Sequence, residues 1–122
     1  MNEQAGVIKQ VIDLTETMEE GIEFIKDKLN EGKPEKAIKM LLDTTTAFTH
    51  IEETLEPMLP ELPENSIEEK TDKLRSALAI MVSEYEKSQG LRGREILQFN
   101  LEPAFKKWRE ELKEVLNPYI LS

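Results

Sequence analysis

The residues of this chain that could do chemistry are concentrated in one acidic stretch. Seven carboxylates and no Lys or Arg lie between Glu52 and Glu69. Carboxylate oxygens are the ligands that Mg²⁺ prefers, and they can hold such ions against a phosphate substrate. The only histidine, His50, lies just before this stretch, and the 122-residue chain has no cysteine. A Ser-His-Asp or Cys-His site would have to use His50, and no glycine-flanked nucleophile turn accompanies it.

The spacing within the acidic stretch has a known counterpart. Glu52-Glu53-x-x-Glu56, followed after twelve residues by Glu69-x-x-Asp72, resembles the metal-binding pattern of the all-α nucleotide pyrophosphohydrolases of the MazG type. The resemblance implies that the two motifs lie on adjacent antiparallel helices. It also implies that Mg²⁺ ions bridging a nucleoside triphosphate are held by five carboxylates: Glu52, Glu53, Glu56, Glu69 and Asp72.

The same half-motif is not confined to this stretch. Glu-Glu-x-x-Glu recurs at residues 19–23 and again at residues 110–114, so in a chain this rich in Glu it carries little information. Pro57 also ends the helix directly after Glu56, where a rigid metal site needs the helix to continue. The sequence therefore favours a non-catalytic protein, with the metal-dependent hydrolase as the alternative.

A second group of candidate residues is basic, in a chain whose net charge is −9. The stretch from Lys87 to Arg109 carries six bases and two acids, and it also contains Phe99 and Trp108. Aromatic and Arg side chains are enriched in binding hot spots, and an amphipathic helix can dock against another protein. The candidate partner-binding residues are Arg92, Arg94, Lys106, Lys107 and Arg109, of which the last three are expected on the outer face of the helix.

Four segments with helical periodicity must position these groups. Apolar or small residues recur at steps of three and four over residues 4–30, 34–56, 66–88 and 94–117. The residues expected to point inward are Ile8, Val11, Thr15, Met18, Ile22, Ile25 and Leu29; Ile38, Leu41, Thr45, Phe48, Ile51 and Leu55; Ile67, Thr71, Leu74, Leu78, Met81 and Tyr85; and Leu97, Leu101, Phe105, Trp108, Leu112 and Val115. Four such stripes with short links predict one domain over residues 1–122, an all-α, antiparallel, up-down-up-down four-helix bundle.

Local signals refine the helix ends. Asn30, Gly32 and Pro34 predict a very short first connection, which makes the first two helices an αα-hairpin. Ser66-Ile67-Glu68-Glu69 matches a capping box, with the Ser66 hydroxyl receiving a free backbone N–H group and Glu69 reaching back. Pro103 removes a helical hydrogen bond, so the fourth helix is expected to be kinked or broken between residues 99 and 102.

Composition limits the class of function. The longest apolar runs are only a few residues, far short of the ~20 needed to cross a bilayer, and the first residues do not read as a secretory signal. The strong acidity opposes binding to nucleic acid or anionic lipid. We expect a small cytoplasmic, non-catalytic interaction module, adaptor-like or chaperone-like, without a cofactor. Its expected partner is a protein, which includes a second copy of itself as a homodimer, and Mg²⁺ belongs only to the hydrolase alternative.

Overall fold

The computed structural model describes residues 4–120, which form helices joined by short turns and loops, with no strand in this range. Three long helices come first: α1 (Ala5–Asn30), α2 (Ile38–Leu55) and α3 (Ile67–Ser88). The fourth side of the bundle is formed by α4 (Gly93–Ile96), a π-helical turn η4 (Leu97–Leu101) and α5 (Glu102–Leu116). Short 3₁₀ turns follow α1, α2 and α5 at η2 (Pro34–Lys36), η3 (Leu59–Glu61) and η5 (Asn117–Tyr119).

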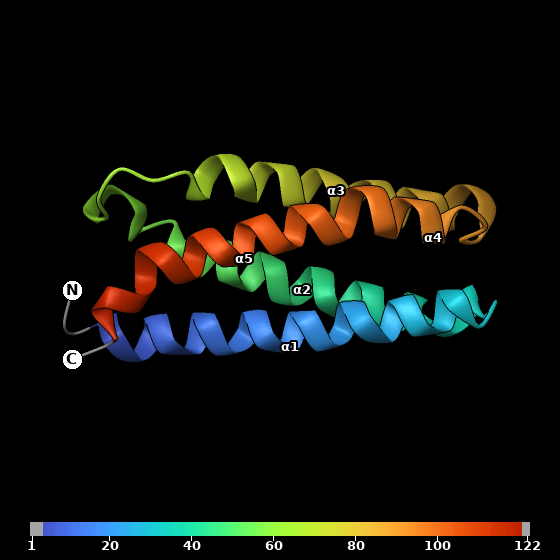
Figure 1. Ribbon diagram of the computed structural model, residues 1–122, viewed down its shortest axis with the longest axis horizontal. Coiled ribbons are helices and arrows are strands. Elements are labelled where there is room, and N and C mark those ends of the chain that lie inside the picture. Colours follow the sequence, from blue (N-terminus) through green and yellow to red (C-terminus); the bar gives the residue numbers. More distant parts are fainter. Residues whose placement is uncertain (1–3, 121–122) are drawn as a thin grey trace.

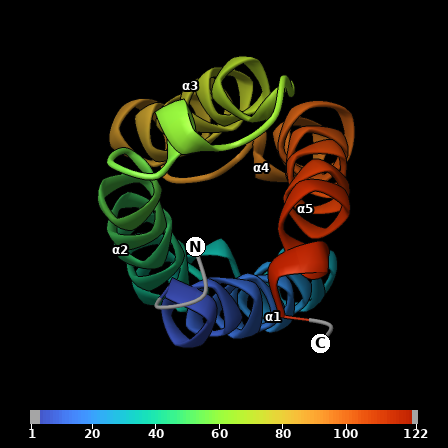
Figure 2. The ribbon, with the colours of Figure 1, turned by 90° about the vertical axis from the view of Figure 1, so that its left-hand side faces the viewer.

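The helices form a four-helix bundle, as the sequence predicted. Successive long helices run in opposite directions along one axis, and α1, α2, α3 and α5 follow one another around it (Figures 1 and 2). The prediction of an all-α, up-down-up-down architecture is therefore confirmed. No helix within residues 4–120 is long and apolar enough to cross a membrane.

The bundle is built from two helix pairs. Helix α1 lies closest to α2, and α3 lies closest to α5, whereas α2 and α3 touch along less of their length. The close approach of α1 to α2 depends on Gly21, because a Cβ atom there would lie 2.7 Å from the Thr44 hydroxyl oxygen and 3.3 Å from the Met40 sulfur. The wider separation between α2 and α3 leaves room for the cavities described below.

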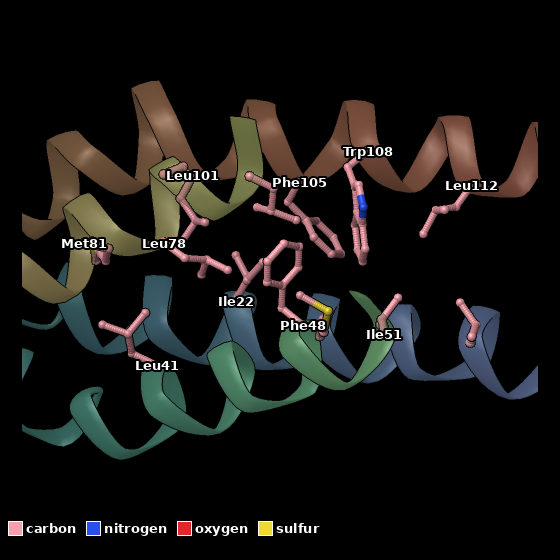
Figure 3. Packing of buried hydrophobic residues seen from close by; sticks show 14 of the residues in the cluster. Ile22, Leu41, Phe48, Ile51, Leu78, Met81, Leu101, Phe105, Trp108 and Leu112 are labelled. Carbon is pink, nitrogen blue, oxygen red and sulfur yellow. The ribbon is translucent and has the colours of Figure 1, made fainter. Parts of the chain in front are cut away.

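One apolar core runs along the bundle axis, and Trp108 lies near its middle (Figure 3). The Trp108 ring centroid is 5.6 Å from that of Phe48 and 6.0 Å from that of Phe105. Its indole N–H donates a hydrogen bond of 3.1 Å to the Thr71 hydroxyl, so this large side chain is buried without an unpaired donor. The indole therefore joins α2, α3 and α5.

Most of the inward residues were predicted correctly, with small errors of register. On α2 the buried threonine is Thr44, not Thr45, because Thr44 is the residue that packs against Gly21. Near the end of α5 the buried residue is Leu116, whereas Val115 is half-buried. Tyr85 is also half-buried, since its hydroxyl donates a 2.9 Å hydrogen bond to the Pro34 carbonyl at the end of the bundle.

The predicted capping box at the start of α3 is wrong. The Ser66 side chain makes no capping hydrogen bond; instead, the Ser66 N–H donates 2.7 Å to a Glu111 carboxylate oxygen on α5. The Ile67 N–H donates 2.9 Å to the Asn65 side chain, and Glu69 pairs with Lys73 at 3.3 Å. A carboxylate from the facing helix is a stronger acceptor at a helix N-terminus than a hydroxyl, so it replaces the local cap.

Pro103 interrupts the fourth helix where the sequence predicted, but the chain does not break there. Pro103 has no N–H to donate to the Phe99 carbonyl, and the five residues before α5 form a single π-helical turn. The Glu102 N–H donates to the Leu97 carbonyl, five residues earlier, as in a π turn. The helical path therefore continues through the turn, and the side chains before it are rotated relative to those after it.

Replacing Gly21 with Ala tests the close packing of α1 on α2. Gly21→Ala is expected to destabilise the fold by about 1–3 kcal/mol, the usual cost of adding a methyl group to a filled interface. Chemical denaturation followed by Trp108 fluorescence measures it. The control Gly6→Ala adds a methyl group where no atom lies within 4 Å and should be neutral or slightly stabilising. Thr44→Ala should rescue Gly21→Ala; equal effects of both glycine substitutions would contradict this packing.

Candidate functional site

Four of the five predicted metal-binding carboxylates line one cavity between the end of α2 and the start of α3. The cavity has a volume of about 380 Å³, and its lining includes Glu52, Glu53, Glu56 and Asp72. Glu68 lines it as well, whereas Glu69 does not, because its carboxylate is paired with Lys73 on the outer surface. The helical hairpin thus brings both half-motifs together, except for Glu69.

Arg75 also enters this acidic group, although the acidic motifs themselves contain no base. Its guanidinium donates to Asp72 at 2.7 Å and also to Glu52, so it links α3 to α2. These two hydrogen bonds raise the pKa of Arg75 above its ordinary value. The i,i+3 spacing of Asp72 and Arg75 was the available signal, since residues three apart share a helix face.

Arg75 changes what the acidic group can do. It is paired with two of the four carboxylates and offsets one of their two negative charges, and within residues 4–120 no three acidic or histidine side chains converge in a way that could hold a metal ion. The arrangement is that of an ion-paired helix contact beside an open cavity. His50 is exposed on α2 and borders a separate pocket against α1, which these carboxylates do not line.

A second cavity extends the first along the same pair of helices. It has a volume of about 350 Å³ and shares Thr49, Glu52 and Arg75 with the acidic cavity. Its lining is mainly apolar and small, with contributions from Phe48, Thr45, Leu78, Ala79 and Val82, and Glu86 lies at its far end. The two cavities adjoin at the Arg75–Glu52 ion pair, which lines both, and we call them together the α2–α3 groove.

The predicted basic residues do not all lie on one outer surface. The prediction is wrong for Arg109: its side chain is only 17% exposed and lies between α5 and α1. There it donates 3.2 Å to the hydroxyl of the buried Thr15 and pairs with Glu19. This site was missed because its partners are on the first helix, and no local pattern connects them.

The other four basic residues are exposed, and they flank two exposed apolar side chains. Phe99 is 70% exposed and Leu91 is 83% exposed, which are unusually high values for large apolar residues. Phe99 lies in the π turn, two residues after the buried Leu97, and therefore on the opposite side of the helix from the core. We call these exposed residues together, Leu91, Arg92, Arg94, Phe99, Lys106 and Lys107, the C-terminal helix face; Arg94 and Lys106 also line cavities against α1.

Glu84 holds the start of this face in place. Its carboxylate accepts hydrogen bonds from the Ser88 hydroxyl and, at 2.8 Å, from the Arg92 backbone N–H. Both bonds favour the charged form, so they lower the pKa of Glu84 below its ordinary value, the Ser88 contact contributing most. In the same connection, Gln89 and Gly90 have φ angles of 57° and 86°, which let the chain turn from α3 into α4.

Comparison with known proteins places the chain in a family but does not identify a reaction. The chain belongs to the family described as Domain of unknown function (DUF8042), which matches residues 6–111. The matched range includes all four sides of the bundle, the α2–α3 groove and the C-terminal helix face. No curated protein and no solved structure matches the chain significantly.

Millimolar Mg²⁺ is expected to leave the melting temperature unchanged, relative to a monovalent salt of equal ionic strength, because Glu52 and Asp72 are already paired with Arg75. An ion present at a hundredfold its dissociation constant would instead add about 2.7 kcal/mol of stability. Thermal melts followed by the fluorescence of Trp108, the single tryptophan, measure this. An increase in wild type that is lost in Asp72→Asn would contradict the expectation and restore the hydrolase alternative.

Glu84→Gln is expected to lower the melting temperature at neutral pH. Because the folded pKa of Glu84 is depressed, its stabilising contribution is present above the ordinary carboxyl range and is lost as the pH falls through the folded pKa. The difference from wild type should therefore shrink toward zero in acid. Melts across a pH series measure it, with the exposed Glu86→Gln on the same helix as control. A pH-independent difference would argue against this role.

Proposed function

We propose that this chain is a non-catalytic protein–protein interaction module that docks through its C-terminal helix face onto an acidic protein surface. The observation that carries the proposal is the exposure of Phe99 between bases on both sides, Arg92 and Arg94 before it and Lys106 and Lys107 after it. Aromatic and Arg side chains are the types most enriched in binding hot spots.

The charges of this face are available to a partner. Within residues 4–120, no carboxylate is paired with Arg94, Lys106 or Lys107, and Arg92 contacts Glu95 only at 3.5 Å on an exposed surface. The chain as a whole has a net charge of −9, but at physiological salt charges act over only about 8 Å. A local basic face can therefore attract an acidic surface, while the rest of the molecule repels it and thus favours one orientation.

The π turn supports a functional role for Phe99. π-helical turns are rare, and they occur frequently at functional sites. Here the turn places a large aromatic ring on the solvent side of the helix, where it adds nothing to the core. Burial of this ring against a partner would recover the hydrophobic free energy that is unused in the isolated chain.

Site-specific photo-crosslinking tests the proposal. A photoreactive phenylalanine analogue replaces Phe99 in the full chain, and the same analogue replaces Phe24, which is 39% exposed on α1 and serves as the control. In the cells that normally produce the protein, the analogue at position 99 should crosslink to a carboxylate-rich segment, identified by mass spectrometry. The analogue at position 24 should not.

Charge reversal sharpens this test. Lys106→Glu combined with Lys107→Glu should reduce the crosslink from position 99 by about tenfold or more, because two attractions become repulsions. High salt should have a similar effect. The proposal fails if crosslinking from position 99 matches that from position 24, or if it is insensitive to both charge reversal and salt.

A further inference from the structure

We propose that a cavity between α1 and α5 binds a free α-amino acid that has an apolar side chain. The cavity has a volume of about 590 Å³, which falls in the range of roughly 300–1,000 Å³ that is usual for small-molecule sites. Lys106 belongs both to this cavity and to the C-terminal helix face, but Phe99 and Lys107 do not line the cavity. Binding of a small molecule here therefore goes beyond the proposed function.

Two ion pairs between α1 and α5 bound the cavity along the helices. Arg109 pairs with Glu19 toward one end, and Glu102 pairs with Lys26 at 3.7 Å toward the other. On each helix the two paired residues are seven positions apart, or about 10 Å at ~1.5 Å per residue. The space between the two ion pairs therefore has the length of one small molecule.

Opposite charges lie on the two walls of this space. Helices α1 and α5 lie side by side and run in opposite directions (Figures 1 and 2), so Glu23 and Lys106 each fall between the two ion pairs, and both line the cavity. No ion pair joins Glu23 to Lys106 in the described part of the chain. The residues before them, Ile22 and Phe105, also line the cavity and are only 3% and 6% exposed. A ligand here meets a carboxylate on α1, an ammonium group on α5 and apolar side chains beneath.

The balance of charge in the lining decides the class of ligand. Once the two ion pairs are set aside, the lining has two carboxylates and two ammonium groups that are unpaired within residues 4–120: Glu23, Glu110, Lys106 and Lys113. The carboxylates would repel a simple anion, and the ammonium groups would repel a simple cation. A zwitterion suits both, with its ammonium group toward Glu23 and its carboxylate toward Lys106.

Arg109 offers a held donor to the carboxylate of such a ligand. Its Nε donates 3.2 Å to the buried Thr15 hydroxyl and its Nη1 pairs with Glu19, so two contacts fix the guanidinium. A guanidinium has five N–H groups, and donors therefore remain after these contacts. Lys106 and Lys113 lie three positions before and four positions after Arg109, on the same helix face. The three bases together form the carboxylate-binding side of the cavity.

Isothermal titration calorimetry on the full chain tests the proposal with L-leucine as the probe. L-leucine should bind with a Kd of about 1 mM or tighter. Three analogues should each bind at least about tenfold more weakly, because each lacks one of the recognised groups. They are 4-methylpentanoate, which has no ammonium group, 3-methylbutylamine, which has no carboxylate, and glycine, which has no apolar side chain.

Variants of the two walls locate the site. Glu23→Gln and Lys106→Gln should each weaken binding of L-leucine by about tenfold, since each removes one charge-assisted contact. The matched controls Glu20→Gln and Lys9→Gln change exposed residues of α1 outside the lining and should bind like wild type. Trp108 fluorescence melts show whether each variant is folded. The proposal is overturned if L-leucine does not bind at millimolar concentration, if either singly charged analogue binds as tightly, or if folded Glu23→Gln and Lys106→Gln both bind like wild type.

Discussion

The burial of Trp108 is the interaction on which the rest of the structure depends. Its ring packs against Phe48 and Phe105 and its N–H reaches Thr71, so one side chain fixes the spacing of α2, α3 and α5. Helices α2 and α3 touch along less of their length than α1 and α2 do, or than α3 and α5 do. A groove therefore remains beside the indole, and Trp108 itself forms part of its lining. The core and the candidate binding surface therefore share a residue.

Helical periodicity predicts the architecture because it is a local property. Ile8 to Leu29 on α1 repeat at steps of three and four, and α1 buries this stripe as expected. Pro103 likewise acts on its own helix, so its position was sufficient to predict the interruption. The error at Ser66 has a different origin, since the Glu111 carboxylate that replaces the predicted cap is 45 residues away. No local pattern could have indicated it.

In the candidate sites, too, the features set by local sequence were predictable and those set by tertiary contacts were not. The hairpin between α2 and α3 was predictable, and so was the approach of Glu52 and Glu53 to Asp72. What the sequence did not reveal is that Arg75 pairs across the helices with Glu52, or that Arg109 turns inward to Thr15. Both arginines donate hydrogen bonds to carboxylates or hydroxyls on other helices, and the identity of these partners depends on tertiary packing. The exposure of Phe99 was also not predicted, because it depends on the π turn.

The Arg109 contact also bears on how the protein is made. Arg109 and Thr15 are 94 residues apart, so the ribosome must synthesise all of the intervening segment before α1 and α5 can meet. Until then α1 and α2 can pair, but the stripe that later faces α5 remains uncovered. A nascent α1–α2 hairpin therefore exposes apolar surface of the kind that leads to aggregation or to capture by a chaperone.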